Sequence, residues 1–478
     1  MFARLPLGCG LLLLVGGLPL LAFFALVGAV AADSSGAELV KPFVLQETLS
    51  PTPPVPSGTF APPSQPPVTP IPPAAPLAAA PDGDDILNVL LLGSDTENPV
   101  NAGRTDAIML VSINRTAGTV NLLSIPRDLF VYIPGWTMQR INTAFGYGEH
   151  NGIEGGGVAL LRDTILYNLG VRVDFYARVD FVDFRRIVDA LGGVEIAVDC
   201  AIQDWRLIEP ELDPEVEEHW ELFTLPVGVH LMNGDLALWY VRSRRTSSDF
   251  DRGRRQQDLM RALWRRLRDL GLLNQLPALW GQVVEIVETD MQLPDLLGLV
   301  PLALTIDASR IAHFTFRPNE EVRAWRTPDG ASVQLLVPDR AQGLLNDFMQ
   351  PPTQNRLVQG GPVVEVLNAT GHAGLDQVAA DGLAWEGFLT LAGGEEQGQY
   401  RAVSVVYDYT GRSKGSAVDA LLEALRLPPD AVIVEPDPDR AVDYRVVLGA
   451  DYRSCGHHVL PPVPTPTPEM PLAQGNTP

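Results

Sequence analysis

Apolar runs of strand length alternate with helical periods between residues 84 and 350, and this alternation restricts the fold more than any other feature of the chain. We expect strands at residues 86–92, 107–113, 119–125 and 129–133, and helices at 158–169 and 184–191. Such alternation is typical of a helix-covered sheet. The sequence therefore predicts an α/β domain over residues 84–350.

A second, shorter stretch repeats this pattern over residues 361–455. Strand-like runs such as "PVVEVLNAT", "AVSVVYDY" and "DYRVVLGADY" are separated by helical periods at 375–383 and 417–425. This order predicts a small βαβαβ module. Asn368, Asp408 and Asp451 follow its strands and are expected to be turn or cap residues, so we interpret the module as a binding or structural unit without catalytic residues.

The first 32 residues favour a membrane anchor. The segment from Leu5 to Ala32 is apolar, and Arg4 is its only flanking side-chain charge before Asp33. As a helix it is long enough to cross about 30 Å of hydrocarbon, and Arg4 favours the inside. We expect an uncleaved signal anchor at 1–32, with all later residues extracytoplasmic. A cleaved signal peptide ending at "AVAAD" and a lipoprotein box ending at Cys9 are the alternatives.

Proline-rich segments flank the two predicted folded parts. Residues 33–83 contain fourteen prolines between Pro42 and Pro81, which predicts an extended, semi-rigid extracytoplasmic linker. Residues 456–478 have a similar composition and are expected to be a disordered tail.

Charge and cysteine content exclude several classes of protein. The formal net charge of −23 would repel a phosphate polymer, so nucleic acid is not expected as a partner. The three cysteines lie far apart and form no CxxC pair. They predict neither a disulfide scaffold nor a cysteine zinc site.

Two aspartates stand at the ends of neighbouring predicted strands. Asp95 follows the first strand, and Asp106 precedes the second in "GRTDAIMLVSIN". Carboxylates at adjacent strand ends can share a Mg²⁺ ion, which needs only one or two of them when phosphate and water supply the other ligands. The alternative is that both are turn or cap residues.

Arginines gather in one window of this acidic chain. Residues 242–268 contain ten arginines and three aspartates, and a helix is predicted from about Arg254. Cations at a helix start are disfavoured by the helix dipole, so Arg252, Arg255 and Gln256 indicate an anion site there. Arg242 and Arg244 are expected to alternate on one side of a preceding strand. A solvated basic patch is the alternative for these residues, and it is our interpretation of Arg261, Arg265 and Arg268.

A further arginine interrupts the apolar run "LLSIPRDLFVYIPG". Pro126 predicts the end of a strand, and Arg127 would then be presented at that end, with Asp128 orienting it or capping the turn. A surface turn is the alternative. The chain has no Walker loop and no G-x-S-x-G elbow. Arginines without a nucleophile motif suit phosphoryl transfer, in which the attacking hydroxyl belongs to the acceptor.

These segments together resemble the LytR-CpsA-Psr family over residues 84–350. The resemblance is carried by "NVLLLGSD", "RTDAIMLVSIN", "LLSIPRDLFVYIPG", "RINTAFGYG", "VDFVDFRRIVDALGGVEIAV" and "LMNGDLALWYVRSRRTSSDFDRGRRQQ". Residues 361–455 resemble the LytR C-terminal module. The resemblance implies an α-β-α layered domain with a central mixed sheet whose core holds a lipid tail, followed by a small α/β module.

The resemblance also implies a function and a set of site residues. Members are membrane-anchored phosphotransferases that move a glycopolymer from a polyprenyl-pyrophosphate carrier to peptidoglycan, with Mg²⁺ or Mn²⁺. Asp95 and Asp106 would be the metal-linked carboxylates. Residues that would surround the pyrophosphate, the first four of them also assigned to catalysis, are Arg104, Arg127, Arg242, Arg244, Arg140, Arg252 and Gln256.

The sequence departs from the family pattern in two places. Thr96 and Glu97 follow the GSD, where the family often has an arginine, and the acidic insertion "DWRLIEPELDPEVEEHWELF" alters the expected acceptor side. Two alternatives remain open. One is a non-catalytic envelope regulator, since family members carry the name transcriptional attenuator. The other is a protein that binds polyprenyl pyrophosphate or cell wall without transferring anything.

Overall fold

The structure of the chain is a computed structural model that describes residues 70–94, 104–210, 212–352, 360–396, 400–412 and 416–456. The predicted anchor at 1–32, most of the linker, Asp95 and all but one residue of the predicted tail lie outside these ranges. Within the described ranges, no helix combines the length and apolar character needed to cross a bilayer.

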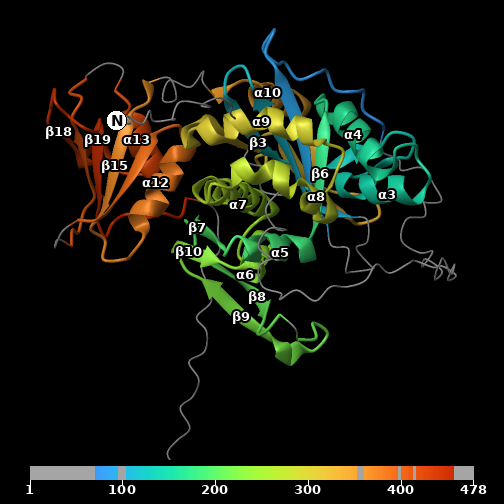
Figure 1. Cartoon of the computed structure of the whole chain (residues 1–478), viewed down its shortest axis with the longest axis horizontal. Coiled ribbons are helices and arrows are strands. Elements are labelled where there is room, and N and C mark those ends of the chain that lie inside the picture. Colours follow the sequence, from blue (N-terminus) through green and yellow to red (C-terminus); the bar gives the residue numbers. More distant parts are fainter. Residues whose placement is uncertain are drawn as a thin grey trace, which may run out of the picture.

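A six-stranded mixed sheet forms the centre of the larger domain (Figure 1). Its strands, in spatial order, are β11 (Glu288–Thr289), β6 (Phe175–Asp180), β1 (Ile86–Ser94), β2 (Thr105–Asn114), β3 (Thr119–Ser124) and β12 (Ile311–Thr315). β2 is antiparallel to both β1 and β3, whereas β6 and β12 pair in parallel with β1 and β3. The predicted α/β fold with a mixed sheet is confirmed.

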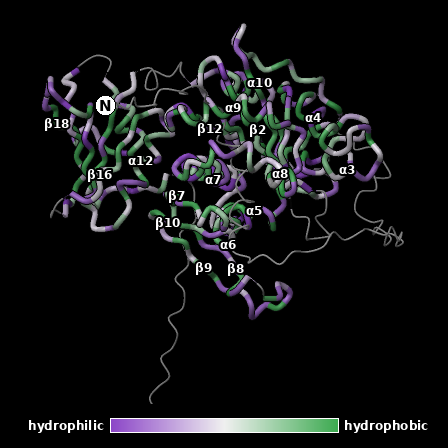
Figure 2. The backbone as a smooth tube through the Cα atoms, in the orientation of Figure 1, coloured by the Kyte–Doolittle hydropathy of each residue, from purple (hydrophilic) through white to green (hydrophobic). Residues whose placement is uncertain are grey.

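Both faces of this sheet are buried under helices. Successive side chains of a strand point to opposite faces, so Val89 and Leu91 join one core while Leu90 and Leu92 join the other. The helices over the first face are α5 (Phe181–Ala190), α6 (Gly234–Arg242), α7 (Asp249–Asp269), α8 (Leu276–Ile286) and α9 (Leu293–Thr305). Those over the second are α3 (Ala144–His150), α4 (Gly156–Leu169) and α10 (Pro338–Met349). The apolar interior of this α-β-α arrangement is visible in Figure 2.

Four two-stranded hairpins or ribbons complete the larger domain. They pair β4 (Phe130–Tyr132) with β5 (Met138–Arg140), β7 (Val194–Val198) with β10 (Gly228–Met232), β8 (Ile202–Leu207) with β9 (Trp220–Leu225), and β13 (Val322–Arg326) with β14 (Ser332–Leu336). The acidic insertion of the sequence forms the β8–β9 hairpin, which projects from the body of the domain in Figure 1.

The C-terminal module has its own five-stranded sheet and core. The strand order is β16 (Leu389–Glu395), β15 (Val363–Asn368), β19 (Tyr444–Leu448), β17 (Val405–Asp408) and β18 (Val432–Val434). Helices α12 (Leu375–Trp385) and α13 (Val418–Leu425) pack on it. The predicted strands and helices of this module are present, while β16 and β18 were not predicted. β16 contains two adjacent glycines and is largely exposed, so it lacks an apolar signal.

The end of the predicted linker lies along the larger domain. The amide N–H groups of Ala75 and Ala78 donate to Tyr167 and Gly170 at the end of α4, and Ala79 N–H donates to Asn346 on α10. These hydrogen bonds hold the last residues before β1 against the domain, so this part of the linker is not a free spacer.

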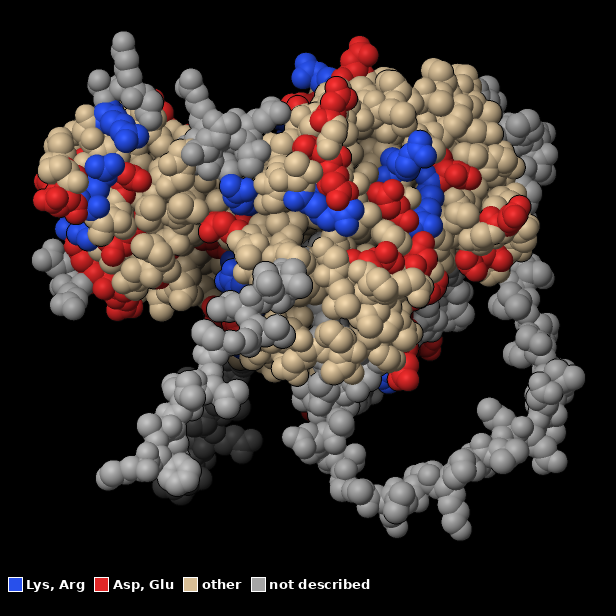
Figure 3. Space-filling view, turned by 45° about the horizontal axis from the view of Figure 1, so that its top comes forward, with Lys and Arg blue, Asp and Glu red and all other residues tan. Residues whose placement is uncertain are grey.

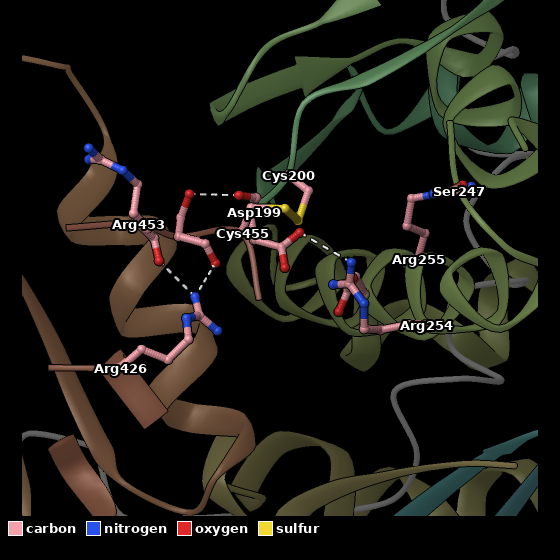
Figure 4. The surroundings of a disulfide bond; sticks show 10 residues. Asp199, Cys200, Ser247, Arg254, Arg255, Arg426, Arg453 and Cys455 are labelled. Carbon is pink, nitrogen blue, oxygen red and sulfur yellow. Dashed lines mark hydrogen bonds and ion pairs between the residues drawn. A yellow bond between two sulfur atoms is a disulfide. The ribbon is translucent and has the colours of Figure 1, made fainter. Parts of the chain in front are cut away.

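A disulfide joins the two folded parts, which corrects the expectation from cysteine spacing. Cys200 follows β7, Cys455 follows β19, and the two are bonded across 255 residues of sequence (Figure 4). Ser454 Oγ donates to Asp199 O beside this bond. The prediction was wrong because the two cysteines meet only when the module packs against the domain, a contact that spacing does not reveal.

Two arginines predicted to be solvated are instead part of this contact. Arg261 and Arg265 of α7 both pair with Asp381 of α12, and the Arg261 side chain is only 1% exposed. Burial lowers the pKa of Arg261, although Asp381 opposes that effect. Arg268 pairs with Asp269 and keeps 37% of its side chain exposed, so the predicted solvation holds only for Arg268.

Candidate functional site

A pocket of about 220 Å³ lies between the central sheet and helices α5, α6 and α7. Most of its lining is apolar and comes from Leu91, Leu92, Met109, Ala177, Val179, Phe181, Phe184, Leu238, Val241, Leu259 and Met260. Its polar lining includes Asp106, Arg127, Arg242, Arg244, Arg252 and Gln256. The fold therefore brings six residues predicted from the sequence to one pocket, and most of the other residues that line it are apolar.

Arg127 reaches the pocket from the end of β3. Leu129 N–H donates to Pro126 O, which forms a turn directly after the strand. Arg127 Nη1 then donates to Asp106 Oδ1 at 2.6 Å. Burial would lower the pKa of Arg127, but Asp106 outweighs burial and raises it. The residue is thus a permanently charged cation held by a neighbouring strand.

Asp128 does not hold Arg127 in the way we predicted. Its backbone oxygen accepts from Gln334 N–H, and its buried Oδ1 has no hydrogen-bond partner among the described residues. Burial, with Asp249 nearby, raises the pKa of this carboxyl. The carboxylates that orient Arg127 are therefore Asp106 and Asp249, which are distant in sequence.

Asp249 stands at the centre of the arginine cluster, and sequence reasoning missed it. Its carboxylate lies 3.2 Å from Arg244 Nη1 and 3.7 Å from both Arg127 Nε and Arg252 Nη2. Burial would raise its pKa, but Arg252, Arg244 and Arg127 together lower it. The anion that we expected at this helix start is thus supplied in part by the chain.

The local sequence explains why Asp249 occupies that position. It is the first residue of α7, and Ser248 before it forms a capping box with Asp251. Acidic residues are favoured in the first helical turn by the dipole. The motif "SSDFD" was therefore an available signal for both the helix start and the acidic centre.

Arg242 and Arg244 do not lie on a strand, which corrects the predicted alternation. Arg242 is the last residue of α6, with its guanidinium 4.4 Å from the centre of the Phe181 ring. Arg244 lies in the connection to α7, where its N–H donates to Asp204 Oδ2 at 2.7 Å. The helical reading was missed because "LALWYV" is an apolar run that periodicity alone does not distinguish from a strand.

Arg252 and Gln256 lie one turn apart on α7 and face the pocket together. Burial lowers the pKa of Arg252 to about 10, with Arg127 and Arg244 adding to the effect and Asp249 opposing it. Gln256 Nε2 donates to Val241 O on α6 at 3.4 Å. The predicted third member of this group, Arg255, is instead buried and donates to Tyr240 O and Ser247 Oγ, so it supports the connection between α6 and α7.

The remaining predicted residues are not among those that line the pocket. Arg140 ends β5 and donates to Ser332 O. Arg104 precedes β2, two residues before Asp106, and its buried Nε has no hydrogen-bond partner in the described part of the chain. Asp95 lies outside the described residues.

Of the two predicted metal ligands, Asp106 lines the pocket. Over the described residues, no group of three or more His, Cys, Asp or Glu side chains is arranged to hold a metal. The Asp106 carboxylate is 24% exposed and faces the pocket. One such carboxylate is compatible with Mg²⁺, which keeps water and takes phosphate oxygens as its other ligands.

This arrangement suits an amphipathic anion. Guanidinium groups bind phosphate oxygens through several N–H donors in one plane, and the apolar lining favours a hydrocarbon group. On the face shown in Figure 3, basic and acidic side chains are interspersed, so positive charge is not continuous over that face.

Comparison with known proteins identifies the same two parts of the chain. Residues 69–347 match the model of the LytR_cpsA_psr family. Residues 362–452 match the module described as LytR cell envelope-related transcriptional attenuator.

Individual relatives are concerned with the cell wall. The polyisoprenyl-teichoic acid–peptidoglycan teichoic acid transferase TagT of Bacillus subtilis is 30% identical over 245 residues, which are 49% of this chain and 70% of that protein. The probable cell wall biosynthesis protein LcpB of Corynebacterium glutamicum is 36% identical over 191 residues, 37% of this chain and 41% of that protein. A crystal structure of B. subtilis TagT covers 57% of this chain and 95% of its own length, with 25% identity and a TM-score of 0.42.

Proposed function

The chain belongs to the LytR_cpsA_psr family, and we propose from this that it is a phosphotransferase that moves a glycopolymer from a polyprenyl-pyrophosphate carrier to a hydroxyl of peptidoglycan. The observation that carries the proposal is the joining of an arginine cluster to an apolar pocket. A carrier of this kind has the same two parts, a pyrophosphate and a hydrocarbon chain. The transferase activity for which the relative TagT is named supports the same class of donor and acceptor.

The proposed role of the arginines is to hold the pyrophosphate and stabilise the charge that develops on transfer. Arg127, Arg244 and Arg252 already converge on Asp249 in this structure. A pyrophosphate would take their free N–H donors, and Arg242 and Gln256 complete the same wall. Because phosphoryl transfer depends on positioning and charge stabilisation, no protein nucleophile is required.

The proposed transfer involves no oxidation or reduction, so it needs no redox partner. A hydroxyl oxygen of the acceptor attacks the phosphorus that carries the glycan, and the bond from that phosphorus to the bridging oxygen breaks. The products are a phosphodiester and polyprenyl phosphate, and the hydroxyl proton is released. Mg²⁺ or Mn²⁺, held by Asp106 and by Asp95, would neutralise phosphate charge when bound.

We further propose that the chain acts outside the membrane to which residues 1–32 attach it. An anchor at that end would keep the domain near lipid carriers, and the last residues of the linker are held against α4 and α10. This proposal is tested by protease protection of the full chain in intact cells.

The function is tested by an in vitro transfer assay. Full-length protein is mixed with a synthetic polyprenyl-pyrophosphate glycan, purified cell wall and Mg²⁺, and the release of polyprenyl phosphate and the glycan bound to the wall are both measured. We expect both products in equal amounts. The absence of polyprenyl phosphate with every donor tried would contradict enzymatic transfer.

The C-terminal match to a module named for transcriptional attenuation favours one other candidate, an envelope regulator. Such a role needs no transfer, and the same assay separates the two. A third candidate, a carrier-binding protein without activity, is separated by an Arg127 variant that keeps lipid binding while transfer is lost.

A further inference from the structure

A second groove lies on the other side of α6 from the pocket. It has a volume of about 530 Å³ and runs between the β8–β9 hairpin and α6. Leu238 and Arg242, one turn apart on α6, line both the groove and the pocket. The two spaces are thus neighbours that share these two side chains.

Aromatic side chains are concentrated in this groove. Trp205, Trp220 and Trp239 line it, and the first two are 52% and 36% exposed. Hydrogen bonds hold the rings of Trp220 and Trp239, since Trp220 Nε1 donates to Pro214 O and Trp239 Nε1 donates to the backbone oxygen of Trp205. An exposed aromatic ring that is already fixed in one rotamer is suited to ligand binding, because it loses little conformational entropy when the ligand binds.

Two arginines that line the groove are paired with carboxylates in or beside it. Arg206 pairs with Glu221, and Arg185 lies 3.7 Å from Asp235. Asp204 accepts from the backbone N–H groups of Arg244 and Arg245. Paired charges offer hydrogen-bond donors and acceptors without a net field, which suits hydroxyl and amide groups better than phosphate.

The tip of the hairpin disfavours an anionic polymer. In the sequence, six acidic residues lie between β8 and β9: Glu209, Glu211, Asp213, Glu215, Glu217 and Glu218. Their charge would repel a chain of phosphodiesters at long range. A neutral saccharide is not repelled, and its C–H faces can pack on indole rings while its hydroxyls bond to the polar lining.

We propose that this groove binds the saccharide backbone of the acceptor and directs one of its hydroxyls past Arg242 to the pyrophosphate. The proposal rests on the proposed function and adds to it the subsite for the acceptor. The hairpin is also tied to the arginine segment, since Gln203 Oε1 accepts from Arg245 Nη1 and Gln203 O accepts from Thr246 Oγ1. The hairpin that lines the groove is therefore fixed to the segment that follows Arg244.

The experiment first measures binding without turnover. The full chain is titrated with a neutral tetrasaccharide of β-1,4-linked N-acetylglucosamine, and in a separate arm with a glycerol-phosphate oligomer, by calorimetry. Wild-type protein is expected to bind the tetrasaccharide, and Trp205→Ala and Trp220→Ala are expected to weaken that binding at least about fivefold each. Tyr400→Ala, which removes an aromatic ring that is 71% exposed on the C-terminal module, is the matched control and should bind like wild type.

The second measurement is transfer at varied acceptor concentration. Both tryptophan variants should raise the KM for the acceptor while the KM for the lipid donor stays within twofold of wild type. Equal tetrasaccharide binding by wild type and both variants would overturn the proposal, as would absent binding by wild type. The proposal would also be overturned if the variants lost only their binding of the glycerol-phosphate oligomer, because the groove would then bind the donor. Since the binding arm needs no donor, a failure of transfer alone contradicts the proposed function and not this subsite.

Discussion

Arg127 and Asp106 form an ion pair in which Nη1 lies 2.6 Å from Oδ1, joining the end of β3 to the start of β2. One of these residues was predicted as a phosphate ligand and the other as a metal ligand. Because they are paired, a phosphate bound to Arg127 and a metal bound to Asp106 would lie next to each other. The phosphate would compete with Asp106 for Arg127, and the metal would compete with Arg127 for Asp106.

Substitution of Arg127 by alanine should strongly lower the rate of transfer while the pocket still binds the lipid part of the donor. The guanidinium is lost from the charge cluster, but the apolar lining that would hold the lipid is intact. We expect kcat to fall about 10²–10³-fold, the cost of removing one transition-state donor. Polyprenyl phosphate release measures kcat, and binding of a fluorescent lipid measures affinity. Unchanged kcat would contradict a catalytic role.

Substitution of Asp106 by asparagine should lower transfer and make it depend on added metal. The variant keeps the side-chain shape but removes a charged oxygen ligand, so activity should fall about tenfold or more and recover in part as Mg²⁺ is raised. Asp290→Asn, on a 37% exposed carboxylate paired with Arg162, is a control expected to match wild type. Full wild-type activity in excess chelator would remove the metal from the mechanism.

Substitution of Asp249 by asparagine should lower the stability of the ligand-free protein. Arg127, Arg244 and Arg252 would then face one another without a shared carboxylate. We expect the free energy of unfolding to fall by about 1–2 kcal/mol, because the carboxylate is only partly buried. Inorganic pyrophosphate should raise the Tm of the variant more than that of wild type. Equal Tm shifts in a thermal scan would show that Asp249 does not occupy the anion position.

The buried carboxyl of Asp258 should make stability depend on pH. Burial raises its pKa to about 6 from 3.8; Asp199 and Asp381 add to this effect, while Arg254 and Arg261 oppose it. Between these values the folded chain holds a proton that the unfolded chain releases. Its stabilising effect is therefore complete below about pH 4 and is lost as pH rises through about 6, by up to about 3 kcal/mol.

The comparison that isolates this effect uses Asp258→Asn. Denaturant unfolding at pH values from 4 to 7 should show a smaller decline of stability for the variant than for wild type. Asp269→Asn, whose carboxylate is 65% exposed, should follow wild type. Parallel curves for wild type and Asp258→Asn would contradict the raised pKa.

Loss of the Cys200–Cys455 disulfide should loosen the C-terminal module from the larger domain. The bond closes a long loop, so its removal in Cys200→Ser/Cys455→Ser should cost about 2–4 kcal/mol in the free energy of unfolding. Hydrogen exchange of α12 should rise, because Asp381 on that helix is held by Arg261 and Arg265. Cys9→Ser, which leaves the bond intact, is the control, and identical unfolding curves for all three proteins would contradict a stabilising clamp.

Much of the fold could be predicted because its signals are local. The apolar runs of β1, β2 and β3 and the periodicity of α4 and α12 appear where expected, since burial of one face imposes a period on neighbouring residues. The pocket residues stood out locally, because Arg127 and Asp106 flank strand ends and the others lie in or beside the arginine-rich helix start, namely Arg242, Arg244, Arg252 and Gln256. The family resemblance then assigned all six to one site.

By itself, the sequence determined which segments become strands and helices, and which residue types carry the charge of the site. Only the tertiary structure decided their partners. Asp249 reaches Arg127 across 122 residues, Asp381 neutralises Arg261 and Arg265 from another module, and Cys200 meets Cys455. Such pairs arise from packing between elements that are distant along the chain. The periodicity of a sequence reports only on neighbouring residues, so it does not predict these contacts.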